Sequence, residues 1–484
     1  MSQTTDWPQM STPPIVAKVP TRRLANLSVR LQSIGRESRS GSVWLDNLAI
    51  LALTVCTWLA LVVVGGTLMF YRRYLATQPL PQEPTVEQVI AHNSGEVYVQ
   101  LAIIACVFVI PAMMSLVAQS AVLGAAGRER RLATLRLIGL SNWAVTRMTL
   151  VETAFQSVIG MILGTILAIG TAPVWALISF NNEHLDPWDM LLPWWGYPAV
   201  WAAVLILALS AAIMGLTRVL VSPLGVSRRE MPKSLRLWRL VLFIALLGGI
   251  YVAVQNLAQQ GSTISGTIAI AAVLFVLMFA VNVFAPLAIQ ILGRVSAFVP
   301  GAFNFVATRR VATNAKETWR RVSAMSYLSF LLGYLAFVPP LTNAEQFGGE
   351  TIVQDVEVGM IITFSIGFLI LLVSTVLTQA SAVFEQSELT KALDFIGAPI
   401  FLHRRVAFKQ TFYPMLVSSA FGFSLGALIC TATIGEGASG ITENLRAGII
   451  ATTYLATVLI AGLLTYTVEP LRRSLLERQV RRND

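Results

Sequence analysis

Long apolar runs alternate with short polar segments along nearly the whole chain. A membrane-spanning helix needs about 20 mostly apolar residues, and ten runs of this chain approach or exceed that length. We place these runs at residues 47–71, 98–123, 153–180, 198–217, 240–256, 264–293, 322–342, 358–384, 410–434 and 447–468. The pattern predicts an all-α integral membrane protein with about ten transmembrane helices.

The composition supports this prediction. The chain has 484 residues, of which 55% are hydrophobic and only 12% are charged. So few charged side chains could not cover the surface of a soluble globule of this size. We therefore expect a polytopic membrane protein.

Basic residues fall mainly on one side of the predicted membrane. If the N-terminus is cytoplasmic, an even number of spans returns the C-terminus to the same side, and 32 of the 35 Lys and Arg residues lie on cytoplasmic segments. Only Arg72, Arg73 and Arg446 fall outside. Cytoplasmic loops of membrane proteins carry an excess of Lys and Arg. The count predicts a multi-pass protein with both termini in the cytoplasm.

The net charge of +10 could also suggest a nucleic-acid partner. The bases, however, are spread over juxtamembrane segments, where anionic membrane lipid is the expected partner, so we predict no nucleic-acid binding. For Arg72 and Arg73 two partners remain open, lipid head groups or an anionic ligand, and we favour head groups.

Catalytic and ion-binding patterns are absent from the sequence. No G-x-x-x-x-G-K-[ST] motif occurs, no histidine has a second metal ligand at a suitable spacing, and no Asp, Glu, Lys, Arg or His lies within the limits of the ten runs. We expect no enzyme activity, no metal and no bound cofactor. The amide side chains in or beside the runs are expected to form hydrogen bonds between helices; they are Gln119, Gln156, Asn282, Gln290 and Gln379.

One polar stretch occurs twice. RERRLATLRLIGLS, residues 128–141, and QSELTKALDFIGAP, residues 386–399, each lead from one apolar run towards the next. A shift of 258 residues superposes Leu135 on Leu393 and Gly139 on Gly397. The chain is therefore predicted to be a tandem duplication, with both copies entering the membrane in the same direction as parallel repeats.

The duplication divides the chain into four spans, two spans and four spans. The predicted units are an N-terminal cytoplasmic segment at 1–45, a first four-helix block at 46–221, a basic linker at 222–239, a central helix pair at 240–293, a cytoplasmic elbow segment at 294–321, a second four-helix block at 322–470 and a basic tail at 471–484. A basic amphipathic segment precedes each block. Each segment is predicted to be a helix lying in the membrane interface, with a solvated basic loop as the alternative.

The third span of each block carries small residues at every fourth position. They are Gly160, Gly164 and Ala168 in the first copy and Ser418, Gly422 and Gly426 in the second. Small residues at this spacing allow a neighbouring backbone to approach closely. We expect these two helices to contact each other, or equivalent partners, near a central pseudo-twofold axis; packing within each block is the alternative.

The segment Gly127–Glu152 resembles the connection between the second and third spans of FtsX-like ABC transporter permeases, the class that includes MacB-type and BceB-type permeases. The resemblance rests on a charged helix, a Leu-Arg pair and a following glycine, here Glu129, Arg130, Arg131, Leu135, Arg136 and Gly139. The SPLGVSRR run after the fourth span is also similar, and the four-two-four arrangement resembles the ten-span BceB-like members.

The resemblance implies that this connection is a coupling helix, which docks into a groove of a separately encoded ATP-binding subunit. Two such helices imply two ATPase copies. These copies, and not this chain, would bind ATP and Mg²⁺. The implied coupling residues are Glu129, Arg130, Arg131, Leu132, Leu135, Arg136 and Gly139, and in the second copy Glu388, Lys391, Leu393, Asp394 and Gly397. An ordinary cytoplasmic loop resting on lipid is the alternative.

The chain also departs from the family. Arg136 is matched by Asp394 in the second copy, so the two docking surfaces would differ in charge. The outer loops Arg72–Val97 and Thr342–Glu357 are too short for the large extracytoplasmic domains of MacB-like and BceB-like members.

We predict a permease of a bacterial-type inner membrane that couples ATP hydrolysis to export or extraction of a hydrophobic or amphiphilic compound, such as an antimicrobial peptide, a lipid or a drug-like molecule. The alternatives are a scaffold that transmits force or a signal to an extracytoplasmic protein partner, and a secondary carrier.

Overall fold

The fold is known from a computed structural model. It describes residues 40–78, 83, 85–137, 141–180, 183–220, 238–257, 264–336, 350–385 and 400–434, together with six isolated positions between 452 and 463. Helices occupy nearly all of these ranges, and six are long and apolar enough to cross a membrane. Two shorter apolar stretches lie within further helices, at Trp238–Ala253 and Ile361–Leu377. The prediction of an all-α membrane protein is confirmed, while the count of ten spans remains a prediction.

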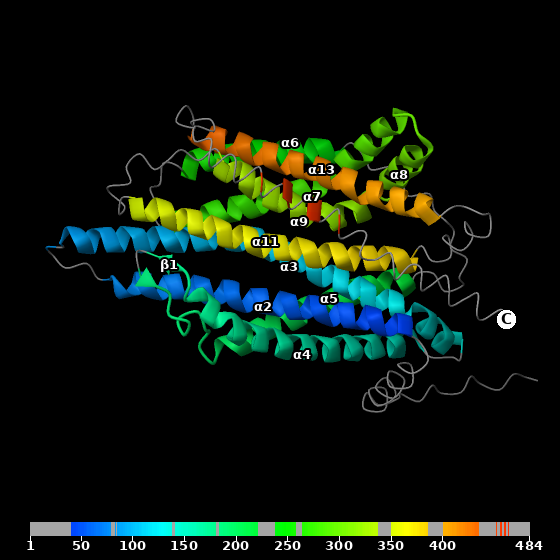
Figure 1. The fold of residues 1–484 in the computed structure, drawn as a ribbon, viewed down its shortest axis with the longest axis horizontal. Coiled ribbons are helices and arrows are strands. Elements are labelled where there is room, and N and C mark those ends of the chain that lie inside the picture. The colour runs from blue at the N-terminus through cyan, green and yellow to red at the C-terminus, as the bar shows by residue number, and fades with distance from the viewer. Residues whose placement is uncertain are drawn as a thin grey trace, which may run out of the picture.

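The helices lie side by side as a bundle (Figure 1). In chain order the elements are α2 (Ser40–Ala76), α3 (Val86–Leu137), α4 (Asn142–Trp175), β1 (Ser179–Phe180), β2 (Glu183–His184), α5 (Gly196–Leu220), α6 (Trp238–Leu257), α7 (Ile264–Val295), the short 3₁₀ helix η1 (Ser296–Phe298), α8 (Ala302–Thr313), α9 (Ala315–Ala336), α11 (Glu350–Glu385) and α13 (Ile400–Ile434). The β1–β2 hairpin lies at one end of the bundle and α8 at the opposite end.

The third apolar run ends as a hairpin. We predicted a span to residue 180, but α4 ends at Trp175, and Ser179 and Phe180 pair antiparallel with His184 and Glu183. Hydropathy could not reveal this boundary, because the residues after Trp175 remain apolar while the backbone turns. The hairpin stands at the end of the bundle that the charge count assigns to the outside.

The small-residue strip of α4 packs against α2, the first span of its own block. A Cβ atom added to Gly160 would lie 2.7 Å from the Cβ of Leu53, and one added to Gly164 would lie 2.7 Å from the carbonyl oxygen of Thr54. Ala168 is buried close to the same contact. Glycine at these positions therefore permits contact between the two helix backbones.

The second strip repeats this arrangement between α13 and α9. A Cβ atom at Gly422 would overlap the carbonyl of Ser326, and one at Gly426 would overlap the carbonyl of Phe330. Ser418 is buried, and its hydroxyl donates to the carbonyl of Met415 on its own helix at 3.1 Å. Each strip thus faces the first span of its own block. This is the alternative that we gave for the strips, and the two third spans do not meet through them.

The second spans, α3 and α11, meet between the two blocks instead. The Ser374 hydroxyl of α11 donates to Oε1 of Gln119 on α3 at 2.8 Å, and Nε2 of Gln119 reaches the carbonyl of Arg320 on α9 at 3.3 Å. Leu116 and Leu377 are fully buried on either side of this contact. Because Gln119 and Ser374 are 255 residues apart, close to the repeat of 258, α3 and α11 occupy equivalent positions about the pseudo-twofold relation of the two copies.

Other amide side chains form the expected bonds between helices. Nε2 of Gln156 on α4 donates to Asp46 on α2 at 2.9 Å. Nε1 of Trp319 on α9 donates to Oδ1 of Asn282 on α7 at 2.6 Å. Gln290 and Gln379 are buried as well. These amides therefore take part in the bundle as structural groups.

The elbow segment before the second block contains the helix α8. One face of α8 is buried through Ala307, Thr308 and Val311, whereas Phe305 and Val306 are exposed. Exposed apolar side chains beside arginines suit a helix in the membrane interface. The predicted elbow ended at Arg321, but α8 ends at Thr313 and α9 begins at Ala315, so the last bases of this segment belong to α9. The elbow predicted before the first block lies outside the described residues, apart from the start of α2.

Candidate functional site

An apolar cavity of about 190 Å³ lies between α2, α3 and α11, at the end of the bundle that carries the β1–β2 hairpin. Its walls are mainly aliphatic, with a few aromatic side chains on the side of the hairpin. The lining residues are Val62, Val63, Gly66, Thr67, Met69, Phe70, Tyr98, Leu101, Ala102, Ile104, Ala105, Val109, Trp175, Phe180, Leu185, Met190, Asp355, Gly359, Ile362, Thr363 and Ile366. Both blocks contribute, because α11 belongs to the second.

One carboxyl group stands in this wall. Asp355 is 6% exposed, and the hydroxyl of Tyr98 donates a hydrogen bond to it across the α3–α11 contact. The neighbouring hydroxyls of Thr67 and Thr363 bond to their own helices, each donating to a backbone carbonyl at 2.8 Å. Asp355 therefore provides a hydrogen-bonding carboxyl group beside an apolar space.

Two acidic residues that lie just outside the predicted spans are buried inside the bundle. Asp355 was placed outside the eighth run, which we began at residue 358, but α11 begins at Glu350 and carries Asp355 into the bundle. Glu152, one residue before the third predicted run, is 2% exposed in α4. Apolar runs underestimate helix length because a helix continues through polar residues that have partners inside the protein.

The hairpin and the loop after it close the outer end of the cavity. The ring of Phe180 packs edge-on against Phe70, with centroids 5.2 Å apart, and lies 6.0 Å from the ring of Tyr98. The carbonyl of Met190 rests against Gly65 of α2, where any Cβ atom would overlap it. We call residues 179–180 and 183–190 the outer cap, because the charge count assigns this end of the bundle to the outside. The cap is held by aromatic contacts and by close backbone packing.

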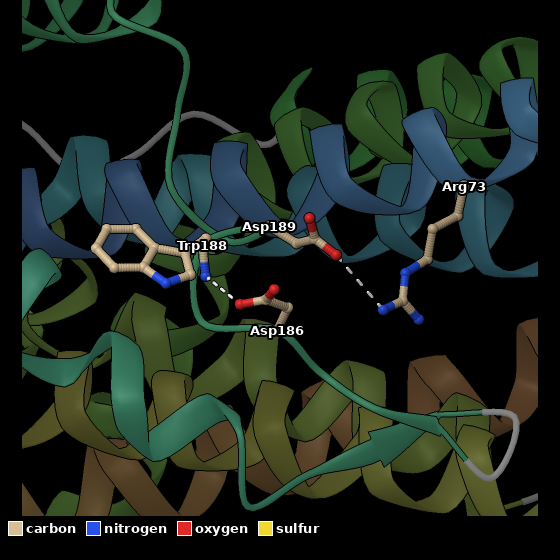
Figure 2. Close-up of polar contacts among 4 residues, drawn as sticks. All are labelled: Arg73, Asp186, Trp188 and Asp189. Carbon is tan, nitrogen blue, oxygen red and sulfur yellow. Dashed lines mark hydrogen bonds and ion pairs between the residues drawn. The ribbon is translucent and has the colours of Figure 1, made fainter.

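A charged contact joins the outer cap to α2 (Figure 2). Arg73 lies 3.7 Å from the carboxylate of Asp189, and the two side chains are 32% and 51% exposed. In the same loop the backbone N–H of Trp188 donates to Asp186 at 3.0 Å. An ion pair this exposed contributes about 0–1 kcal/mol. Arg73 thus contacts an acid of its own chain, a partner that neither sequence interpretation included.

The predicted coupling residues are only partly described. The backbone of Glu129, Arg130, Arg131, Leu132, Leu135 and Arg136 forms the last turns of α3. Gly139 lies outside the described residues, as do Glu388, Lys391, Leu393, Asp394 and Gly397 in the second copy. As far as Leu137, the first predicted coupling segment is therefore a continuation of α3, without a break between them.

The described residues contain no group of three or more His, Cys, Asp or Glu side chains that could hold a metal ion. Within the same part of the chain, His92 shares a hydrogen bond of 3.2 Å with the Thr77 hydroxyl and lies beside the ring of Tyr74. Its contacts are those of a side chain that packs at a helix end.

Sequence reasoning missed the cavity and its acid. The internal repeat held a usable signal, because the shift of 258 places Tyr98 opposite Val356, one residue from Asp355. Residues at equivalent positions of two parallel copies can meet where the copies pack together. The signal could be used only once the second spans were known to form that contact.

Comparison with known families supports the predicted class. Residues 103–223 match the family model described as FtsX-like permease C-terminal. The match begins within α3, includes the first coupling segment, α4 and the outer cap, and ends just beyond α5. No curated protein shows significant similarity to the chain.

Proposed function

Because residues 103–223 match the family model described as FtsX-like permease C-terminal, we propose that this chain is the membrane subunit of an ABC transporter that expels or extracts a hydrophobic or amphiphilic compound. ATP and Mg²⁺ bind to a separate ATPase subunit, and the chain itself catalyses no reaction. Two coupling segments correspond to two ATPase copies. FtsX-like permeases generally pair with such subunits.

The observation that carries this proposal is the continuity of α3. The same helix lines the cavity from Tyr98 to Val109 and contains the first coupling segment in its last turns. At about 1.5 Å per residue, the 28 residues from Val109 to Leu137 span roughly 42 Å. Pro111 removes one hydrogen bond from the helix but does not end it. A displacement of the coupling segment therefore reaches the cavity wall through one element.

The position and lining of the cavity indicate the class of substrate. Its wall is almost entirely apolar, and it lies near the outer end of the bundle beneath a cap of about a dozen residues. Sites for hydrophobic molecules combine apolar walls with a few polar groups that fix orientation. The outer loops are too short to capture a large soluble substrate, which leaves a compound taken from the membrane.

Reconstitution tests this function. The chain and its cognate ABC ATPase would be placed in liposomes, and ATP hydrolysis would be measured while a hydrophobic amphiphile is titrated. We expect hydrolysis to rise with the amphiphile, and we expect the rise to disappear in Gly359→Leu, which fills the cavity without a backbone clash because nothing lies within 4 Å of an added Cβ atom. Gly170→Leu is the matched control, since that site also has open space and does not line the cavity.

Two other outcomes correspond to the alternatives. Hydrolysis stimulated only by an extracytoplasmic protein would support the force-transmitting scaffold. Uptake driven by an ion gradient in the absence of any ATPase would support a secondary carrier. Either result would overturn export of a small amphiphile.

A further inference from the structure

The cavity combines one acid with a limited apolar volume. Asp355 and the Tyr98 hydroxyl form its polar corner, while aliphatic side chains of α2, α3 and α11 make up most of the remaining wall. An apolar cavity of about 150 Å³ accommodates benzene. A space of about 190 Å³ therefore suits one aromatic ring or a short alkyl chain rather than an entire large amphiphile.

Charge on the outer segments favours a cation. The segments that the charge count assigns to the outside carry twelve Asp and Glu residues and three Arg residues. One of these arginines, Arg73, contacts Asp189 of the outer cap and also lies close enough to Tyr98 for its charge to act on the phenol. A surface with an excess of acids raises the local concentration of cations and repels anions.

The Tyr98–Asp355 hydrogen bond can be exchanged for a stronger one. A neutral hydroxyl donates to this carboxylate in the structure. Hydrogen bonds between an ammonium group and a carboxylate are roughly twice as strong as bonds between neutral groups. A bound amine would thus replace the phenol at the carboxylate, while its apolar group fills the space beside Gly359 and Ile362.

We propose that this cavity binds the apolar group of a small cationic amphiphile, with the amine of that amphiphile held by Asp355. The inference names the substrate class of the proposed exporter and rests on that function for its biological role. Binding itself requires no ATPase, so the two can be tested separately.

The test is photolabelling of the purified full chain in nanodiscs without ATPase. Three probes share one diazirine-bearing octyl chain and differ only in the head group, which is a primary amine, an alcohol or a carboxylate. Labelled peptides are mapped by mass spectrometry. We expect the amine to label cavity residues about tenfold more efficiently than the alcohol or the carboxylate.

Variants separate charge from shape. Asp355→Asn keeps the size of the side chain and can still accept the Tyr98 hydrogen bond, so we expect amine labelling to fall about tenfold while alcohol labelling stays unchanged. Tyr98→Phe removes the competing hydroxyl and should raise amine labelling. Gly359→Leu should abolish labelling by all three probes, whereas Gly170→Leu should not.

Several results would overturn the inference. Equal labelling by the amine and the alcohol, or amine labelling unaffected by Asp355→Asn, would make this a neutral apolar site, such as one for a lipid acyl chain. Labelling that survives Gly359→Leu would place the bound probe elsewhere. If the cavity binds the amine as expected but ATP hydrolysis does not respond to it, the export function is wrong and the binding site stands.

Discussion

The α2–α4 interface and the α9–α13 interface are built on the same pattern of small residues, yet their polar groups differ. In the first, Trp58 donates to the Thr171 hydroxyl at 2.9 Å, which ties α2 to α4. In the described part of the second, the hydroxyls of Ser326 and Ser329 are buried without a hydrogen-bond partner, whereas α4 of the first has one such hydroxyl, that of Thr153. A buried polar group without a partner costs about 1–3 kcal/mol. The duplication has thus preserved backbone contact but not polar stabilisation, and we expect the second interface to separate more easily.

The largest effect is expected from filling the backbone contacts. Gly426→Ala would overlap the Phe330 carbonyl, whereas Gly164→Ala would meet Thr54 at 2.7 Å, so both should destabilise the protein and Gly426→Ala should do so more. Overpacking of this kind costs about 1–3 kcal/mol. Thermal unfolding in detergent measures it, with Gly170→Ala as a control that has open space. Equal stability of Gly426→Ala and the control would show that this backbone contact does not hold the block together.

The next effect compares the two coupling segments. Arg136→Glu reverses charge in the first copy, and Asp394→Lys does so at the equivalent position of the second. Because the first copy carries the family pattern, we expect Arg136→Glu to weaken association with the ATPase about tenfold, and Asp394→Lys to have a smaller effect. Pull-down at several salt concentrations measures both. Equal losses would reject unequal coupling.

Hydrogen bonding at the two interfaces should give effects of opposite sign. Thr171→Val removes the acceptor for Trp58 while keeping the shape of the side chain, and should lower stability by about 1 kcal/mol. Ser326→Ala removes a hydroxyl that has no partner, and should leave stability unchanged or raise it by up to about 1 kcal/mol. The unfolding temperatures of the two variants, each compared with that of the unmodified protein, test these expectations. Destabilisation by Ser326→Ala would mean that this hydroxyl is satisfied in the membrane.

The smallest effect concerns the outer cap. Arg73→Gln removes the ion pair with Asp189 and should cost less than about 1 kcal/mol, because both side chains are partly exposed. We expect faster amide hydrogen exchange within residues 183–190, with the adjacent Arg72→Gln as the control. Identical exchange in both variants would show that aromatic and backbone contacts alone hold the cap.

Sequence reasoning found the helices more reliably than their ends or their neighbours. Apolar runs predicted the helices because lipid-facing and buried positions alike require apolar side chains. The end of α4 at Trp175 could not be predicted, since the chain stays apolar through Phe180 while its hydrogen-bonding pattern changes. The strips of small residues were recognised, but which helix they faced depended on packing that no local pattern encodes.

The site was harder still to predict. Its acid and its phenol, Asp355 and Tyr98, are 257 residues apart, and the cavity exists only because α2, α3 and α11 come together. The predicted coupling segment, by contrast, consists of consecutive residues, and in the first copy these residues lie within the family match. Contiguous motifs can be read from one sequence, whereas a cavity formed by distant helices requires the fold.

The length of α3 would allow this helix to act as a lever. Gln119, bonded to α11 and α9, divides α3 into an arm of about 27 Å towards Leu137 and an arm of about 32 Å towards Tyr98. A pivot at Gln119 would turn a push on the cytoplasmic arm into an opposite and slightly larger movement of the outer arm. A movement of the ATPase would then displace the wall of the cavity in the opposite direction.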